Sequence, residues 1–195
     1  MITYKQLHKL HQGFSILEVL VALIVLSLGV LGAVGMQATA LKSNKEVRYQ
    51  AVAGTLAREL AEKMRGNHAI AIKTSAANNP YLVNTIATAF VNTAPGDSEN
   101  CFKSACANGS VVAAWDMYDW QTRLVTALPS PQVVTCFDAT PYTSAGIAQW
   151  ACSNTGDTMV VKMSWTRSNT AGALEFATLA TEPQVIIPLT AGSSE

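Results

Sequence analysis

The chain has 195 residues, which is enough for one domain of ordinary size together with a membrane anchor. Its 13 Lys and Arg balance its 13 Asp and Glu, and only 13% of its residues are charged. Proteins that bind nucleic acid usually carry a basic patch and a high pI, and the composition shows no such footprint.

The first twelve residues form a short polar leader. Residues 1–12 contain Lys5 and Lys9 and no acidic residue. Because basic residues tend to stay on the cytoplasmic side of a membrane, we expect this end of the chain in the cytoplasm. The basic residues between positions 42 and 48 act against this orientation, and Glu46 offsets one of them. The favoured topology has the N-terminus inside and the cysteines outside.

A long apolar segment follows the leader. Residues 13–36, GFSILEVLVALIVLSLGVLGAVGM, carry a single charged side chain, Glu18. A run of this length and composition predicts a transmembrane helix. A carboxylate in lipid either takes up a proton or finds a cation, because burying it ionised and unpaired is costly. We therefore interpret Glu18 as functional, the alternative being an interfacial carboxylate that reaches the lipid headgroups.

The junction between leader and apolar segment differs from that of an ordinary secretory signal. A secretory signal has its small-residue cleavage site after the apolar core. Here the basic stretch runs directly into Gly13–Phe14, and the apolar segment comes afterwards. Cleavage between Gly13 and Phe14 would remove the leader, retain the helix and change the formal charge from 13 − 13 = 0 to 11 − 13 = −2.

The helix is expected to continue past the membrane boundary. No proline occurs between residues 14 and 79. Apolar side chains then recur at three- and four-residue steps, which predicts one face packed on a globular domain. These side chains are Tyr49, Val52, Leu56, Leu60 and Met64. Glu59 and Lys63 form an i,i+4 pair on the polar side, and Gly66–Asn67 is the predicted stop.

Three glycines lie in the apolar half of this helix, namely Gly29, Gly32 and Gly35. Small residues allow helix backbones to approach closely in lipid. Each glycine also weakens a helix interior by about 1 kcal/mol. Glycine is common in membrane helices in any case, so these interpretations stay open at the level of the sequence.

The rest of the chain predicts one further helix and several closely spaced strands. The four-residue spacing from Asp116 to Leu128, ended by Pro129, predicts a helix over residues 114–128. Residues 159–165 alternate in polarity and predict a half-buried strand. Other strands are expected at residues 132–137, 147–152, 173–180 and 184–189. Closely spaced strands favour an antiparallel sheet, which makes the expected fold class α+β.

All four cysteines follow the apolar segment: Cys101, Cys106, Cys136 and Cys152. An even number of cysteines in a domain carried across a membrane predicts two disulfides in an oxidising compartment. Three pairings exist in principle. Proximity in the sequence favours Cys101–Cys106 and Cys136–Cys152.

The polar residues offer no convincing catalytic constellation. His8 and His11 would leave with the leader, and His68 alone cannot supply the several closely spaced ligands of a metal site. The spacing of Cys101 and Cys106 is not that of a C-x-x-C redox motif, which favours a structural bridge. We therefore expect a non-enzymatic protein with no metal and no cofactor.

Two further patterns have alternative interpretations. Asp116 and Asp119 lie among aromatic residues, which is compatible with a sugar-binding cluster but more typical of a helix with an apolar face. Asn108-Gly109-Ser110 matches a glycosylation sequon, and we interpret it as a turn.

The junction residues resemble a known signal. Gly13, Phe14, Ser15 and Glu18 in GFSILEVLVAL, ahead of an uncleaved apolar helix, resemble the class III signal of type IV pilins and pseudopilins. The match requires a basic leader, a junction glycine, a following phenylalanine and a glutamate four residues later. It covers the first third of the chain and identifies the superfamily.

Later blocks resemble the minor pilins of the PilV type. The helix of that group often ends in Ala-Arg-Glu-Leu followed by Met-Arg-x-Asn, and residues 57–60 and 64–67 match both blocks. The region from Asp116 to Pro129 and the block from Val161 to Trp165 are also similar. Ser130–Pro131 departs from the glycine-rich turn expected there, which leaves the conformation of that turn open.

The resemblance implies a specific processing and fold. A prepilin peptidase would cut after Gly13 and methylate the new amine of Phe14. The expected domains are a cytoplasmic leader (1–13), a long helix (14–66, with 14–36 in the membrane) and a periplasmic or extracellular domain (67–195). The C-terminal half of the helix would pack on the antiparallel sheet, giving a type IV pilin-like α+β fold.

The resemblance also implies a function. The chain is expected to be a minor pilin in the bacterial inner membrane that promotes the start of pilus assembly and resides near the tip of a surface pilus. Its partners would be other minor and major pilins, the prepilin peptidase and the inner-membrane assembly platform, with no nucleic acid. Glu18 is expected to pair with the Phe14 ammonium of a neighbouring subunit. The alternatives are a minor pseudopilin of a type II secretion system and an adhesive or binding subunit.

Overall fold

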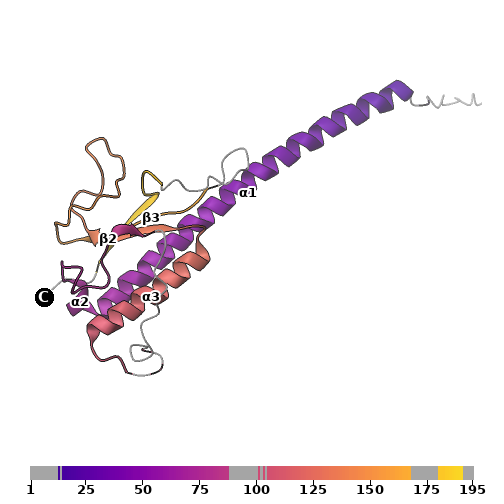
Figure 1. The fold of residues 1–195 in the computed structure, drawn as a ribbon. Helices are drawn as coiled ribbons and strands as arrows, with labels where there is room; N and C mark the ends of the chain where they lie inside the picture. The colour runs from indigo at the N-terminus through magenta and orange to yellow at the C-terminus, as the bar shows by residue number, and fades with distance from the viewer. Residues whose placement is uncertain are drawn as a thin grey trace, which may run out of the picture. The chain divides into compact units, whose positions relative to one another are not determined.

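The computed structural model describes residues 13, 15–87, 101, 103, 105–167 and 180–190. Its longest element is the helix α1 (Ile16–Gly66), shown in Figure 1. The chain divides into two compact units, residues 1–44 and 45–195. α1 begins in the first unit and ends in the second, and each unit is described separately below.

The C-terminal part of α1 is the central helix of the second unit. Its buried side chains recur at the spacing of one helix face: Ala53, Leu56, Ala57, Leu60, Ala61 and Met64. Tyr49 and Val52, also predicted for this face, are partly buried against the same core. Lys63 and Arg65 lie in the last turn, where cations favour the helix dipole. The helix ends at Gly66, which confirms the predicted stop.

The sheet has four antiparallel strands in the order β1-β2-β3-β4. The strands are β1 (Val83–Ala87), β2 (Gln132–Phe137), β3 (Met159–Ser164) and β4 (Val185–Leu189). A long N-terminal apolar helix followed by an antiparallel sheet is the α+β, type IV pilin-like architecture that the sequence predicts.

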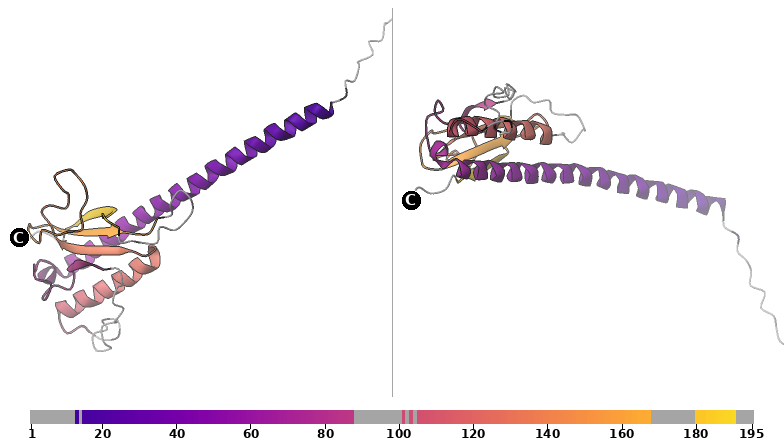
Figure 2. Two further views of the ribbon diagram at one scale, coloured as in Figure 1. Left: turned by 45° about the horizontal axis from the view of Figure 1, so that its top comes forward. Right: turned by 90° about the horizontal axis from the view of Figure 1, so that it is seen from below.

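Two shorter helices complete the second unit: α2 (His68–Ala71) and α3 (Gly109–Ala127). The views in Figure 2 show α3 beside the C-terminal half of α1, and the indole of Trp120 donates to the Leu56 carbonyl at 2.8 Å between them. α3 begins at Gly109 rather than at the predicted residue 114. The reason is Asn108, whose Oδ1 accepts from the backbone N–H groups of Ser110 and Val111 at 3.0 and 3.1 Å. Asn108 is thus a helix N-cap, not part of a simple turn.

The strand predictions have mixed outcomes. β2, β3 and β4 lie where the sequence places strands. The prediction of a strand at residues 147–152 is wrong. These residues are irregular, and their only β-type pairing is an isolated bridge from Ala148 to Tyr142. Most of the strand expected at 173–180 lies outside the described residues. β1 and α2 were not predicted, because residues 67–112 have weak periodicity.

The prediction of a half-buried β3 is also wrong, because all six of its residues are buried. Val161 and Met163 join the main core with α1 and α3. Val160, on the other face, joins a second cluster with Val134 and Cys136. The chain between β2 and β3 covers this outer face, so both faces of the sheet are enclosed there.

Candidate functional site

The start of α1 is defined by the residues of the junction. Gly13 is exposed and lies outside the helix, and Phe14 lies outside the described residues. The Ser15 carbonyl accepts from the N–H groups of Glu18 and Val19 at 3.0 and 3.3 Å. The Ser15 hydroxyl accepts from the Leu17 N–H at 3.3 Å. Ser15 is therefore the N-cap of α1, and Gly13 lies two residues before this cap in the sequence.

Glu18 is exposed in the first turn of α1. The helix N-terminus has unpaired N–H groups and a partial positive charge, which favour a carboxylate at this position. Ser15-x-x-Glu18 also has the spacing of a capping box. Sequence reasoning missed this local contribution, although the S-x-x-E signal was present.

The apolar half of α1 has the dimensions and composition of a membrane span. It holds an 18-residue window that is long and apolar enough to cross a bilayer, and none of this window is buried. Leu17, Leu20, Leu23 and Leu26 are among the large side chains exposed along it. Such exposure suits a hydrocarbon environment.

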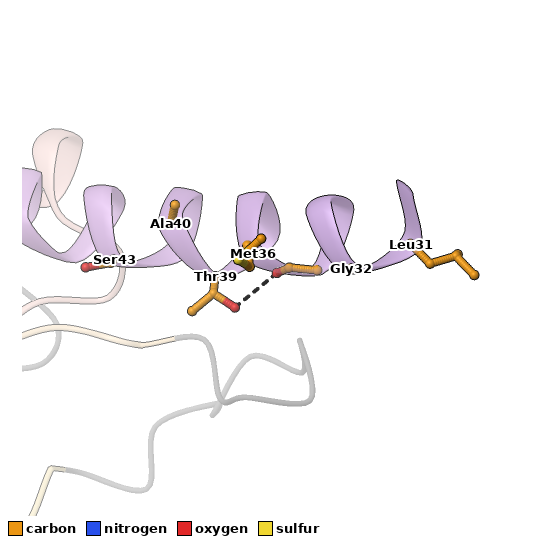
Figure 3. A pocket seen from close by; sticks show the side chains of 7 residues that line it. Leu31, Gly32, Met36, Thr39, Ala40 and Ser43 are labelled. Carbon is orange, nitrogen blue, oxygen red and sulfur yellow. Dashed lines mark hydrogen bonds between the residues drawn. The ribbon is translucent and has the colours of Figure 1, made fainter. Parts of the chain in front are cut away.

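Two hydroxyl side chains of this segment form hydrogen bonds within the helix. The Ser27 hydroxyl donates to the backbone carbonyl of Ile24 at 3.1 Å and also to that of Leu23. The Thr39 hydroxyl donates to the Gly35 carbonyl at 3.2 Å, as Figure 3 shows. Bonds of this kind leave no hydroxyl hydrogen without an acceptor in an apolar environment.

A shallow groove on this helix is lined mainly by small side chains (Figure 3). Its lining is Leu31, Gly32, Gly35, Met36, Thr39, Ala40 and Ser43. A Cβ built at Gly29, Gly32 or Gly35 meets nothing within 4 Å. Crowding within the described chain therefore does not explain these glycines.

In the second unit, the charged residues that the sequence highlights join α1 to α3. Lys63 lies 3.2 Å from a carboxylate oxygen of both Asp116 and Asp119. The Arg123 guanidinium donates a bidentate pair of hydrogen bonds to the Glu59 carboxylate. The sequence pairs Glu59 with Lys63 along α1, whereas in the structure each reaches across to α3. These contacts fix the packing of the two helices.

The aromatic residues near Asp116 also have structural roles. Trp120 is fully buried. The Tyr81 hydroxyl donates to Asp116 Oδ2 at 2.7 Å, and burial, together with this bond to a carboxylate, raises the pKa of Tyr81 well above its ordinary value. Asp116 and Asp119 are already paired with Lys63, so this cluster is part of the core packing and not an open sugar site.

The cysteines form two disulfides, the pairing that proximity favours. Cys101 is bonded to Cys106, with Cα atoms 5.1 Å apart. Cys136 is bonded to Cys152, with Cα atoms 6.3 Å apart. Asp138 lies near the second bridge, and together the three residues resemble a metal-ligand set. The set does not fit a metal, because both sulfurs are oxidised and Asp138 already contacts the ammonium of Lys162 at 2.6 Å.

Comparison with known proteins identifies the N-terminal signal. Residues 8–34 match the family model described as the prokaryotic N-terminal methylation motif. No curated protein and no solved structure shows a significant match to the chain. The matched segment contains the junction, Glu18 and the start of α1, and it supports a class III signal peptide of the type IV pilin and pseudopilin kind.

Proposed function

We propose that the chain is a minor pilin of the PilV type that promotes the start of type IV pilus assembly and resides near the tip of the fibre. The observation that carries the proposal is the methylation motif at residues 8–34. It coincides with a junction placed one residue before a capped helix, Gly13–Phe14 followed by Ser15. The junction is followed in the sequence by an apolar helix, and none of the 18-residue stretch of this helix that could cross a membrane is buried.

Processing at the junction converts the precursor into an assembly subunit. A prepilin peptidase cuts between Gly13 and Phe14 and methylates the amine of Phe14. Residues 1–13 are lost as the cytoplasmic leader, residues 14–36 anchor the subunit in the bacterial inner membrane, and the domain of residues 67–195 lies on the periplasmic side. The anchor then leaves the lipid for the fibre, where it packs with other pilins.

Glu18 provides the register of assembly in this proposal. It is exposed on α1, one helical turn after the amine that cleavage creates. A neighbouring subunit shifted along the fibre axis brings its own Phe14 ammonium beside Glu18. The opposite charges then neutralise each other in an apolar surrounding, where an unpaired carboxylate is costly.

The blocks that resemble PilV-type minor pilins occupy contact positions in the second unit. Asn67 donates to the Gly109 carbonyl at 2.6 Å. A Cβ at Gly109 would lie 2.7 Å from Asn67 Oδ1, so a side chain at this position would displace the Asn67 amide. Arg65 donates to the Thr190 carbonyl at 3.1 Å, joining the end of α1 to the end of β4. The resemblance therefore involves residues that determine how helix and sheet pack, which supports a shared domain architecture.

Processing is tested by co-expressing the full chain with a prepilin peptidase and measuring intact mass. We expect loss of residues 1–13 and addition of one methyl group. Gly13→Val should block the cut, because a side chain hinders close approach to the backbone, whereas the matched change Gly29→Ala should not. Normal processing of Gly13→Val would contradict the assigned junction.

Assembly is tested by comparing subunit amounts in purified fibres and in membranes. Glu18→Ala should accumulate in the membrane and be depleted from fibres. Glu62→Ala is a matched control, since Glu62 is also an exposed carboxylate on α1 and contacts only Arg65 among the described ion pairs. If Glu18→Ala enters fibres as the wild type does, the register role of Glu18 is wrong.

Deletion of the gene distinguishes a role in a type IV pilus from a role in a type II secretion system. Loss of surface pili and twitching motility with intact protein secretion is the expected result. Loss of secretion with intact pili would assign the chain to a type II secretion system as a minor pseudopilin. Binding of the intact fibre to a surface that is lost without this subunit, with pilus number unchanged, would assign an adhesive role.

A further inference from the structure

The outer face of the sheet is covered by one loop, residues 138–153, which we call the outer loop. It begins directly after β2 and returns toward β3. The disulfide between Cys136 on β2 and Cys152 ties the C-terminal end of the loop to the sheet. Trp150 and Cys152 pack against Val134 and Val160 of the sheet, so the loop closes a small core of its own.

A buried cation, the Lys162 ammonium, lies under this loop. The side chain of Lys162, on β3, is fully buried (0% exposed). Its Nζ lies 2.6 Å from Asp138 Oδ2, 2.8 Å from the Gln149 carbonyl oxygen and 2.6 Å from the Ala151 carbonyl oxygen. All three oxygens belong to the outer loop, although Lys162 itself belongs to the sheet.

This arrangement makes closure of the outer loop strongly cooperative. A buried ammonium without partners is very unfavourable, so Lys162 stays buried only while all three loop oxygens are in place. Asp138 likewise needs the lysine, because its side chain is 0% exposed. Opening the loop hydrates both charges together and uncovers Val134 and Val160. Partial opening, which would strand one charge, is disfavoured.

We propose that the Cys136–Cys152 disulfide is a redox-sensitive clasp that couples oxidation of the subunit to closure of the outer loop and burial of Lys162. Oxidation joins the two Sγ atoms, and two protons and two electrons pass to an acceptor disulfide, such as oxidised glutathione or a thiol–disulfide exchange protein. Reduction reverses the step and releases one end of the outer loop. The oxidised loop is closed, and the reduced loop opens far more often.

The size of the effect follows from the length of the closed loop. Removing a cross-link around a loop of about 15 residues raises the opening equilibrium roughly 100-fold, the equivalent of about 2.7 kcal/mol. The remaining contacts include the bond from the Trp150 indole to the Ala180 carbonyl at 2.7 Å, so the reduced loop still closes part of the time. A local opening, and not unfolding of the domain, is expected.

The test measures how fast lysines react with an amine-acetylating reagent in the full chain held in nonionic detergent micelles, with peptide mass spectrometry as readout. The variant Cys136→Ser/Cys152→Ser removes the clasp. The matched variant Cys101→Ser/Cys106→Ser removes the other disulfide. Acetylation of the exposed Lys73 measures the intrinsic reactivity of the reagent. Acetylation of Lys63, which links α1 to α3, shows whether the domain as a whole has opened. The wild type is also compared in oxidised glutathione and in dithiothreitol.

We expect acetylation of Lys162 to rise about 100-fold without the clasp, with Lys63 and Lys73 unchanged, and the same rise in reduced wild type. The Cys101→Ser/Cys106→Ser chain should keep Lys162 protected in oxidised glutathione. Unchanged protection of Lys162 without the clasp would overturn the proposal. So would equal acceleration at Lys162 and Lys63, because the disulfide would then stabilise the whole domain, or loss of protection in the matched variant.

Discussion

Replacing Lys162 by methionine tests the buried ion pair in isolation. Methionine is of similar length but removes the ammonium that contacts Asp138 Oδ2 at 2.6 Å. Asp138 Oδ1 keeps its bonds from the N–H groups of Thr140 and Ser153 at 2.9 and 3.2 Å. Oδ2 is left buried and unpaired, because no other hydrogen-bond partner reaches it in the described chain.

Removing one partner of a buried pair destabilises a protein by about 3–5 kcal/mol. This is a large part of the roughly 5–15 kcal/mol that holds a domain folded. The second change Asp138→Asn removes the stranded charge and keeps an oxygen for the Thr140 and Ser153 donors. The double variant should therefore recover about 2 kcal/mol relative to the sum of the two single changes.

The pH dependence gives a second measure of the same pair. Burial alone would raise the pKa of Asp138, but the Lys162 ammonium and the N–H groups of Thr140 and Ser153 lower it below its ordinary value. The stability that this carboxylate contributes is therefore present above about pH 3.9 and is lost as the pH falls through the lowered pKa. The deficit of Lys162→Met should be largest near pH 7 and shrink in acid.

The assay is urea unfolding of the full chain in nonionic micelles, followed by tryptophan fluorescence, since Trp120 and Trp165 are buried in the second unit. Lys73→Met is the control, because Lys73 is exposed and its replacement should change the free energy of unfolding by less than about 0.5 kcal/mol. A cost below about 1 kcal/mol for Lys162→Met, or strict additivity with Asp138→Asn, would refute the reasoning.

Three further predictions concern the α1–α3 packing. Burial and the bond to Asp116 raise the pKa of Tyr81, so its neutral phenol stabilises the fold below about pH 10, and this stability is lost as the pH rises further. In urea unfolding measured from pH 8 to 11, the free energy of unfolding of Tyr81→Phe should therefore fall less steeply with pH than that of the wild type. Asn108→Ala removes the cap of α3 and should cost about 1 kcal/mol, with less helical circular dichroism; Asn108→Gly should cost only a few tenths. Leu60→Ala in the core should cost about 2–5 kcal/mol in urea unfolding, whereas Leu41→Ala, on the exposed part of the same helix, should leave this transition unchanged.

The sequence predicted the end of α1 and the position of β2. The stop of α1 at Gly66 follows from helix-terminal chemistry, and β2 follows from its flanking proline and turn residues. The start of α3 was missed because the cap, Asn108, precedes a glycine and two β-branched residues that lower helix propensity. Capping was the stronger influence there.

The alternation of apolar and polar residues along β3 could not reveal that the outer face of the sheet is buried. The pattern of β3 places Lys162 on a polar face, and a polar face is normally solvated. Only the tertiary structure shows that residues 138–153 fold back over it and supply three oxygens to the ammonium. A lysine flanked by Val161 and Met163 was the available signal, because an isolated charge within an apolar strand needs a partner.

The position of Glu18 has two explanations that act at different scales. The capped helix start, with Ser15 at its N-terminus, favours an acidic residue in the first turn of every copy of the chain. This stabilisation of the helix N-terminus acts within one molecule, so it cannot determine how a neighbouring subunit is positioned. Yet Glu18 remains exposed, in a segment where an unpaired carboxylate is costly in lipid. The cap therefore explains why the helix tolerates the carboxylate. In the proposed assembly, a charge partner from outside the molecule accounts for burial of Glu18 in a fibre, and the proposed cleavage after Gly13 would create such a partner on every subunit.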